Sequence, residues 1–261
     1  MDAVIEVRHL YTEYEDKKVL HDISMEVYPK EIMVILGPSG CGKSTLLKHM
    51  VGLLHPVSGT VKLFGKDIED MSEDDYFQTL RRMGMLFQGG ALLGSMTVGE
   101  NVALPIREHT KLDNATIELV VGIKLSLVGL AGCETLMPSE LSGGMRKRAG
   151  LARAIALDPE VLLFDEPTAG LDPVTSAGLD QLVLRLRKGL DMTAVVVTHE
   201  LSTMRTIADR VTLMEDGEII AYGTLEEIES SKEPRVTKFL EARYKEAGPS
   251  ELLLETLEEG D

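Results

Sequence analysis

A glycine-rich stretch near the start of the chain combines the residue types that bind phosphate groups. Residues 37–44, GPSGCGKS, fit the pattern G-x-x-x-x-G-K-[ST], and a buried-strand pattern at residues 32–36 comes directly before them. Glycines allow successive backbone N–H groups to face one point, and a helix beginning near Lys43 would add the positive end of its dipole. We expect Lys43 to reach the β- and γ-phosphates of a nucleotide and Ser44 to ligate Mg²⁺. The alternative is a tight glycine turn that binds nothing.

Two acidic residues stand at the end of an apolar run farther along the chain. Residues 161–164 read Val-Leu-Leu-Phe, and Asp165 and Glu166 follow them. Asp165 could hold Mg²⁺ through water, and Glu166 is placed to act as a general base on an attacking water molecule. A strand that ends in a solvated acidic turn is the alternative, and the phosphate-binding pattern in the same chain counts against it.

A second short glycine motif, LSGGM at residues 141–145, lies directly before a predicted helix. Ser142 could present its hydroxyl, and Gly143 and Gly144 their bare N–H groups, to an anion at the N-terminus of that helix. Ser142 is also a good helix N-cap, which is the purely structural alternative. Two anion-binding helix starts are unexpected in a chain that binds a single nucleotide.

The elements that must position these motifs alternate between strands and helices. Apolar and polar residues alternate over the first thirty positions, which predicts antiparallel strands with turns at 15–16 and 28–29. Further strands are expected at 32–36, 61–64, 83–87, 161–165, 193–198 and 210–215, and helices at 44–54, 118–128, 144–157 and 174–188. The strand signal is absent between 89 and 159, which indicates a helical insertion. The alternation predicts an α/β core.

Composition and charge limit the classes of protein that fit. With 44% hydrophobic and 27% charged residues, the chain has the composition of a folded protein. Its formal net charge of −16 would repel a phosphate backbone, so we expect no nucleic-acid partner. Cys41 and Cys133 are far apart, which predicts neither a zinc site nor a disulfide framework. We expect no signal peptide, and the apolar runs are too short to cross a bilayer, so another chain would supply any membrane part.

In combination and order, these motifs resemble those of the nucleotide-binding subunits of ATP-binding cassette (ABC) transporters. That family carries a Walker A loop, a glutamine, an LSGGQ-like signature, a Walker B strand with a following glutamate, a D-loop and a switch histidine. The matching positions are 37–45, Gln88, 141–145, 161–166, 170–172 and His199. The resemblance implies an α/β P-loop NTPase fold, with a RecA-like core, an antiparallel β subdomain and an inserted α-helical subdomain. The expected divisions are core residues 1–88 and 159–240, the helical signature subdomain 89–158 and an acidic tail 241–261.

The resemblance also implies roles for individual residues, with ATP and Mg²⁺ as the bound groups. Tyr14 would stack on the adenine, with Tyr11 as its rival. The other nucleotide-binding residues would be Gly37, Pro38, Ser39, Gly40, Cys41, Gly42, Lys43, Ser44 and Thr45. The catalytic residues would be Glu166, His199 and Gln88, and the Mg²⁺ ligands would be Ser44, Gln88 and Asp165.

In this family two subunits pack head to tail, so that the signature of one faces the Walker A loop of the other. The resemblance therefore implies a homodimer in which Ser142, Gly143, Gly144 and Met145 face the partner's nucleotide, with Asp172 bridging the subunits. ATP would hold the dimer closed, and hydrolysis would let it reopen. Met145 departs from the glutamine that many relatives carry, so we expect retained but slower ATPase activity.

Several segments are similar to one branch of the family, the Mla/Mce-type lipid-transport ATPases, namely residues 86–93, 95–98, 100–105, 141–149, 233–236 and 239–240. What this resemblance implies is ATP-driven phospholipid movement between bacterial membranes, at the cytoplasmic face of the inner membrane. The implied partners are an integral permease (MlaE-like), a lipid-binding Mce-domain protein (MlaD-like) and, in some relatives, a STAS-domain subunit. Residues 89–96 lie where the family docks its permease. The leucines of the acidic tail belong either to a frayed end or to a segment that docks on a neighbouring subunit.

Three other functions stay open on the sequence alone. An importer of amino acids or metals would use the same motor, because the cargo contacts lie on other chains. An ABC protein that acts on nucleic acids usually carries two cassettes or a long coiled coil, and this sequence shows one cassette and no sustained heptads. A small-molecule kinase would have no use for the signature and the switch histidine.

Overall fold

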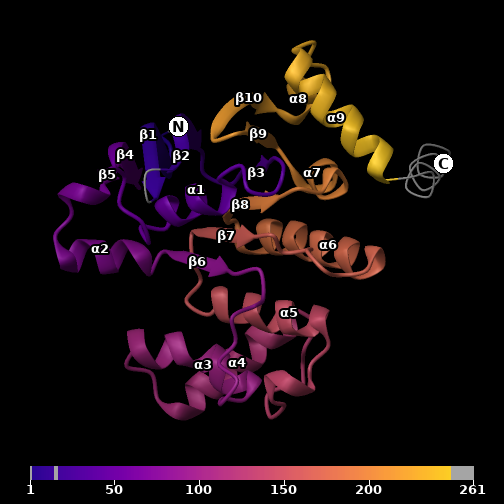
Figure 1. Cartoon of the computed structure of the whole chain (residues 1–261). Helices are drawn as coiled ribbons and strands as arrows, with labels where there is room; N and C mark the ends of the chain where they lie inside the picture. The colour runs from indigo at the N-terminus through magenta and orange to yellow at the C-terminus, as the bar shows by residue number, and fades with distance from the viewer. Residues whose placement is uncertain (1, 15–16, 248–261) are drawn as a thin grey trace.

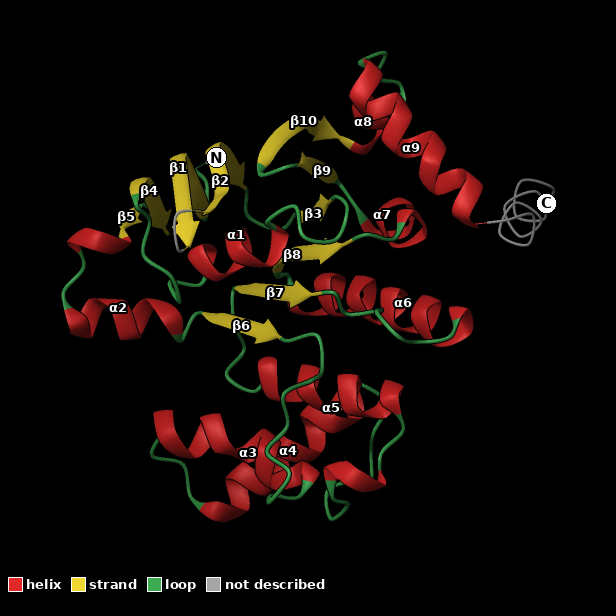
Figure 2. Cartoon of the chain, viewed as in Figure 1, coloured by secondary structure: helices red, strands yellow, loops and turns green. Residues whose placement is uncertain are grey.

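The chain folds around two β-sheets that lie side by side, with a group of helices extending from the edge of the larger sheet (Figure 1). The computed structural model describes residues 2–14 and 17–247, without the side chains of residues 14, 17 and 243–247. Figure 2 shows the strands gathered in the upper half and helices alone in the lower part. The turn expected at 15–16 and the tail leucines lie outside the described residues.

The larger sheet has the strand order β10-β9-β3-β8-β7-β6, and its neighbours are parallel except for β9 and β10. The strands are β3 (Ile32–Leu36), β6 (Met83–Leu86), β7 (Val161–Asp165), β8 (Thr193–Thr198), β9 (Arg210–Glu215) and β10 (Glu218–Thr224). β3 and β8 are buried along their whole length, as expected for parallel strands covered on both faces. The residues that follow β3, β7 and β8 therefore meet at one edge of the sheet.

The smaller sheet is antiparallel, with the order β2-β1-β4-β5. It consists of β1 (Ile5–Tyr14), β2 (Lys17–Val27), β4 (Ser58–Leu63) and β5 (Lys66–Asp67). Its apolar face shares one cluster with helix α1 (Lys43–Met50) and with Met33 and Ile35 of β3. Ile32, Val34 and Leu36 belong to the other cluster, on the opposite face of the larger sheet. This alternation lets one strand contribute to both cores.

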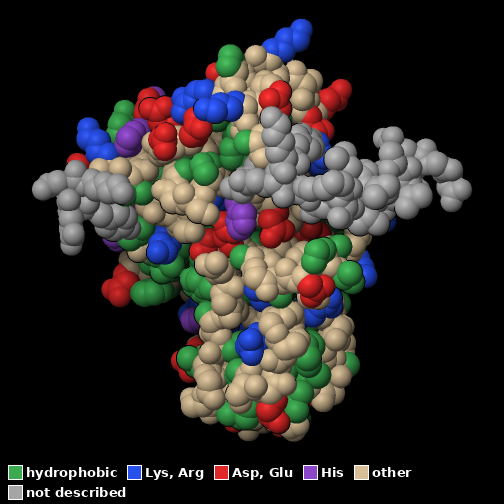
Figure 3. Space-filling model, turned by 45° about the vertical axis from the view of Figure 1, so that its right-hand side comes forward, with side chains coloured by type: hydrophobic (Ala, Val, Ile, Leu, Met, Phe, Trp, Pro, Cys, Tyr) green, Lys and Arg blue, Asp and Glu red, His purple; other side chains and the backbone are tan. Residues whose placement is uncertain are grey.

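Helices replace strands between β6 and β7, as the sequence predicted. α3 (Val98–His109), α4 (Asn114–Leu127) and α5 (Gly143–Ala154) pack on one another, with a 3-10 turn, η2 (Pro138–Glu140), before α5. α3 begins with a capping box between Thr97 and Glu100. Leu119, Ile123 and Leu127 of α4 are exposed, and apolar side chains are visible over the lower, helical part of the surface in Figure 3.

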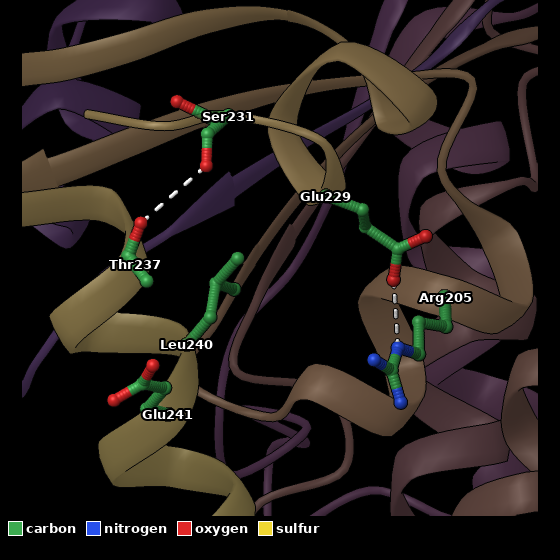
Figure 4. A pocket seen from close by; sticks show the side chains of 6 residues that line it. All are labelled: Arg205, Glu229, Ser231, Thr237, Leu240 and Glu241. Atoms are coloured by element: carbon green, nitrogen blue, oxygen red, sulfur yellow. Dashed lines mark hydrogen bonds and ion pairs between the residues drawn. The ribbon is translucent and has the colours of Figure 1, made fainter. Parts of the chain in front are cut away.

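The remaining helices flank the larger sheet. They are α2 (Glu73–Leu80), α6 (Pro173–Leu190), α7 (Leu201–Ile207), α8 (Leu225–Glu229) and α9 (Pro234–Ala247), with a 3-10 turn, η1 (Ile68–Asp70), before α2. A hollow lies between α7 and the α8–α9 bend (Figure 4), where Nε of Arg205 is 2.8 Å from Oε1 of Glu229. On its other side, the hydroxyl of Thr237 donates to the carbonyl of Ser231 at 3.4 Å. Within the described residues, no helix is long and apolar enough to cross a membrane.

Candidate nucleotide site

The glycine-rich loop joins β3 to α1 at the carboxyl edge of the larger sheet. Gly37 must be a glycine, because a Cβ there would lie 2.4 Å from the carbonyl oxygen of Met214. Gly42 has a φ of 102° and is the N-cap of α1, where no side chain caps the helix. An anion can therefore satisfy the N–H groups of the first turn. Cys41 is buried, and burial raises the pKa of its thiol, which makes it a packing residue and not a nucleophile.

Lys43 is buried at the start of α1, with 4% of its surface exposed. Its Nζ donates to the carbonyl oxygens of Gly37 and Pro38, at 2.8 and 2.9 Å. Ser39 and Gly40 form the exposed tip of the loop above it. The ammonium group is thus held against the concave side of the loop, where a phosphate can attract it away from the two neutral carbonyls.

Ser44 and Asp165 come together although 121 positions separate them in the sequence. The hydroxyl of Ser44 donates to Oδ1 of Asp165 at 2.8 Å, and Thr45 is half-buried beside them. A hydroxyl and a carboxylate are oxygen ligands of the kind that Mg²⁺ prefers, and Mg²⁺ usually takes its other ligands from phosphate and water. Among the described residues, no cluster of three or more His, Cys, Asp or Glu could hold a metal by itself. The residues present therefore fit a Mg²⁺ that is shared with a nucleotide.

Glu166 links Lys43, the predicted phosphate-binding lysine, to His199, the predicted switch histidine. It has a φ of 49°, which is rare for glutamate, and its N–H donates to the carbonyl of Val197 in β8 at 2.9 Å. Its Oε2 lies 2.5 Å from Nδ1 of His199, and its Oε1 lies 3.8 Å from Nζ of Lys43. A mostly buried carboxylate between an imidazole and a buried ammonium group is suited to accept a proton from water.

Gln88 stands apart from the other described residues of the nucleotide site. Gln88 is exposed two residues after β6 and makes no hydrogen bond to the other described site residues. Leu86 of β6 pairs with Phe164 of β7, so Gln88 lies at the same edge of the sheet as Asp165. Tyr14 is the last residue of β1, but its side chain lies outside the described part, so its stacking on adenine stays a prediction.

The signature and the D-loop contact each other within one chain. Ser142 is exposed and caps α5, accepting the N–H of Met145 at 3.2 Å, while Met145 packs against the larger apolar cluster. Gly144 packs on α6, where a Cβ would lie 2.7 Å from Cγ2 of Thr175. Asp172 caps α6 by accepting hydrogen bonds from the N–H and hydroxyl of Thr175, at 3.0 and 2.5 Å. These bonds hold the pKa of Asp172 below its usual value.

Two buried ionisable residues next to this site were missed by the sequence reasoning. Lys147 of α5 donates to the carbonyl of Ala169 at 2.6 Å, and burial lowers the pKa of its ammonium. Asp180 of α6 accepts the hydroxyl of Thr203 at 3.0 Å, and burial raises its pKa to about 7. The position of Lys147, two residues after the signature, is a weak sequence signal of a role near the site. The sequence around Asp180 gives no such signal.

Comparisons with known proteins agree with this arrangement. Residues 20–169 match the family described as "ABC transporter". The intermembrane phospholipid transport system ATP-binding protein MlaF of Haemophilus influenzae is 44% identical over 237 residues, which cover 91% of this chain and 90% of the relative. The probable ribonucleotide transport ATP-binding protein mkl of Mycobacterium leprae is 42% identical over 243 residues, covering 93% of this chain and 70% of the relative.

A solved structure shares the fold. The dimeric structure of the ATP-binding cassette MJ0796, in a post-hydrolysis state with ADP and Pi, matches with a TM-score of 0.77 and 28% identity, over 85% of this chain and 98% of that one. This match confirms the predicted fold, in which an α/β core carries an antiparallel sheet and a helical insertion.

Proposed function

Because this chain belongs to the ABC transporter family and is an ATP-hydrolysing subunit, we propose that it powers phospholipid transport between bacterial membranes through a separate permease. The observation that carries the cargo is the 44% identity to a phospholipid-transport ATP-binding protein over about nine tenths of both chains. The observation that supports its residue roles is the meeting of Lys43, Asp165 and Glu166 at one sheet edge.

The site residues divide the work of hydrolysis. The backbone N–H groups of residues 37–45 other than Pro38, which has none, and the ammonium of Lys43 bind the phosphates of ATP. Ser44, Asp165 and Gln88 would hold Mg²⁺, whose charge offsets the charge that develops on the phosphate oxygens. Glu166 accepts a proton from the water that attacks the terminal phosphorus, and the bond to the departing ADP oxygen breaks. His199 holds the Glu166 carboxylate in place through the bond at Oε2.

The exposed surface around the signature supports a head-to-tail homodimer. Ser142, Gly143 and Asp172 are exposed, and Val174, at the start of α6, leaves 83% of its surface to solvent. The residues of both motifs are therefore accessible to a second copy of the chain. We propose that the signature and D-loop of each copy contact the nucleotide bound by the other. The cassette MJ0796, which shares this fold, was solved as a dimer.

The helical insertion, proposed as a separate subdomain over 89–158, would receive the membrane partner. Residues 89–96 connect the core to α3, and apolar side chains are exposed at Phe87, just before this connection, and at Leu93, within it. We propose that a permease of the MlaE type docks here, with an MlaD-like Mce-domain protein and, as in some relatives, a STAS-domain subunit completing the complex. The chain would then lie at the cytoplasmic face of the inner membrane.

A different cargo is the main competing proposal, because the motor makes no contact with the cargo. The mycobacterial relative carries a name that says ribonucleotide transport, at an identity similar to that of the phospholipid relative. An importer for amino acids or metals would use the same nucleotide site.

The cargo can be tested with the intact membrane complex. The chain is purified with the permease that accompanies it, bound lipids are identified by mass spectrometry, and transfer of labelled phospholipid between vesicles is followed with and without ATP. We expect the complex to contain bound phospholipid and to transfer it only with ATP. The same complex carrying Glu166→Gln should transfer none. A complex without lipid that moves labelled ribonucleotide, amino acid or metal ion would overturn the proposed cargo.

A further inference from the structure

Lys147 is buried between the two motifs that the proposed dimer turns toward its partner. The residue lies in the first turns of α5, two positions after the signature, and 6% of its surface is exposed. Its Nζ donates to the carbonyl of Ala169 at 2.6 Å and lies 3.4 Å from the carbonyl oxygen of Glu166. The ammonium group therefore connects the signature helix to the segment between the acidic pair and the D-loop.

The segment that Lys147 bonds has an unusual backbone. Glu166 and Gly170 both have positive φ, 49° and 77°, and this conformation is rare for a residue with a side chain such as Glu166. Inside the segment, the N–H of Ala169 reaches the carbonyl of Glu166 at 3.3 Å, which is a long hydrogen bond. An ammonium group shared by two carbonyls forms charge-assisted bonds that a neutral apolar side chain cannot replace.

Two carboxylates at the carboxyl edge of the larger sheet balance the charge of Lys147. Burial lowers the pKa of the ammonium, whereas the neighbouring Glu200 and Glu166 raise it. Glu200 follows His199 directly and stands at the N-terminus of α7. Loss of the charge would leave the carbonyl of Ala169 without this donor and remove a cation from the surroundings of both carboxylates.

Direct packing joins the same two motifs nearer the surface. Gly144 approaches Thr175 so closely that a Cβ would clash at 2.7 Å, and a Cβ on Gly143 would lie 3.7 Å from Cδ2 of Leu171. Thr175 is in turn bonded to Asp172. Signature and D-loop are thus held together at a buried point, by Lys147, and at a surface point, by this packing.

We propose that Lys147 is a positioning residue that fixes the signature of one subunit relative to its own D-loop, so that both meet the partner's nucleotide together. This inference rests on the dimer of the proposed function. Lys147 itself touches no nucleotide and acts through Ser142 and Asp172. The shorter of the two Lys147 hydrogen bonds goes to Ala169, next to the D-loop. The main effect of Lys147 therefore falls on the active site in which the partner subunit supplies Glu166.

The first test compares Lys147→Met with a matched control. Methionine keeps an unbranched side chain and removes the charge, and Lys147→Arg restores it. Lys124→Met is the control, because Lys124 is also buried and pairs with Asp158, but lies in α4 away from the motifs. We expect K147M to lower kcat about tenfold or more, since small displacements of a catalytic group cost that much. ATP binding to the single subunit should stay within about twofold, K147R should recover part of the rate, and K124M should keep it.

Mixed dimers show on which side Lys147 acts. With K147M and E166Q in the same subunit, the remaining active site takes its signature from the K147M subunit. With the two substitutions in opposite subunits, the remaining active site takes its Glu166 from the K147M subunit. We expect the larger loss in the first arrangement.

Three results would overturn this inference. They are a larger loss in the second arrangement, equal losses in both, and a K147M rate equal to that of K124M. If K147M does not fold, as a thermal unfolding scan would show, Lys147→Gln is used in the same mixed dimers. The E166Q chain is tested first for dimer formation with ATP. If it forms no dimer, the dimer of the proposed function is wrong, and this failure is known before Lys147 is changed.

Discussion

Replacing Asp180 by Asn should stabilise the nucleotide-free protein most strongly at alkaline pH. Asp180 lies in α6 with 4% of its surface exposed and accepts the hydroxyl of Thr203 in α7 at 3.0 Å. Burial raises its pKa to about 7, and the negative charge of Glu200 adds to the rise. Asparagine has the same shape and can accept the Thr203 hydroxyl without carrying a charge.

The size of the effect follows from the pKa difference between the folded and unfolded chain. A carboxyl group that moves from an ordinary pKa of 3.8 to about 7 binds more protons in the folded state over this interval. The free energy of unfolding therefore falls as the pH rises from about 4 to about 7, and it stays low above that. The full penalty is about 4 kcal/mol, of which about 2.6 kcal/mol accrues between about pH 5 and about pH 8.

Urea unfolding at these two pH values measures the effect. The control is Asp191→Asn, because Asp191 lies exposed at the C-cap of α6, in a left-handed conformation that asparagine also adopts. We expect the stability gap between D180N and the parent to be wider at the higher pH by about 2–3 kcal/mol, with D191N following the parent. Parallel pH dependences of D180N and the parent would refute the reasoning, because they would mean that burial does not keep Asp180 protonated.

Three further predictions concern the nucleotide site. Glu166→Gln should keep ATP binding and lower hydrolysis about a hundredfold or more, trapping a dimer that gel filtration with ATP detects; a fully active variant would mean that another group is the base. Lys43→Ala should weaken ATP binding itself about tenfold or more, since the cation facing the phosphates is lost, and calorimetry should show this. An unchanged affinity for ATP would mean that Lys43 does not bind the phosphates. Ser44→Ala should raise the Mg²⁺ concentration needed for half-maximal ATPase activity, because Asp165 would keep the ion without its hydroxyl neighbour. A Mg²⁺ titration that coincides with the parent's would contradict this.

The central strands could be predicted to the residue. β3, β7 and β8 begin and end where the sequence placed them, because each has an uninterrupted apolar centre with polar or glycine positions at its ends. Such runs are buried on both faces, and burial leaves little freedom in where the strand ends.

Helix ends and short helices were less predictable, since local signals there conflict. α1 ends at Met50 and not at the predicted residue 54, because Gly52 has a φ of 71° and the N–H of Leu53 turns back to the carbonyl of Lys48 at 2.8 Å. This Schellman motif was readable from Gly52. α3 was not predicted as a separate helix, because Pro105 lies inside it and suggests a break.

The residues of the site also divide into those that the sequence could predict and those that it could not. The phosphate loop and the acidic pair are local patterns in which neighbouring residues act together, so their positions could be predicted from spacing alone. The bonds from Lys147 to Ala169 and from Thr203 to Asp180 join residues 22 and 23 positions apart on different elements. No short motif records such pairs, because only the packing of α5 and α7 against their neighbours brings them together.

The most direct test of the nucleotide sandwich is a structure of the Glu166→Gln protein with ATP and Mg²⁺, determined by electron cryomicroscopy. The head-to-tail arrangement predicts two copies of the chain, each with Ser142 facing the phosphates that Lys43 of the other copy holds. A nucleotide-loaded chain whose Ser142 faces its own core or open solvent, with no second copy opposite, would contradict it.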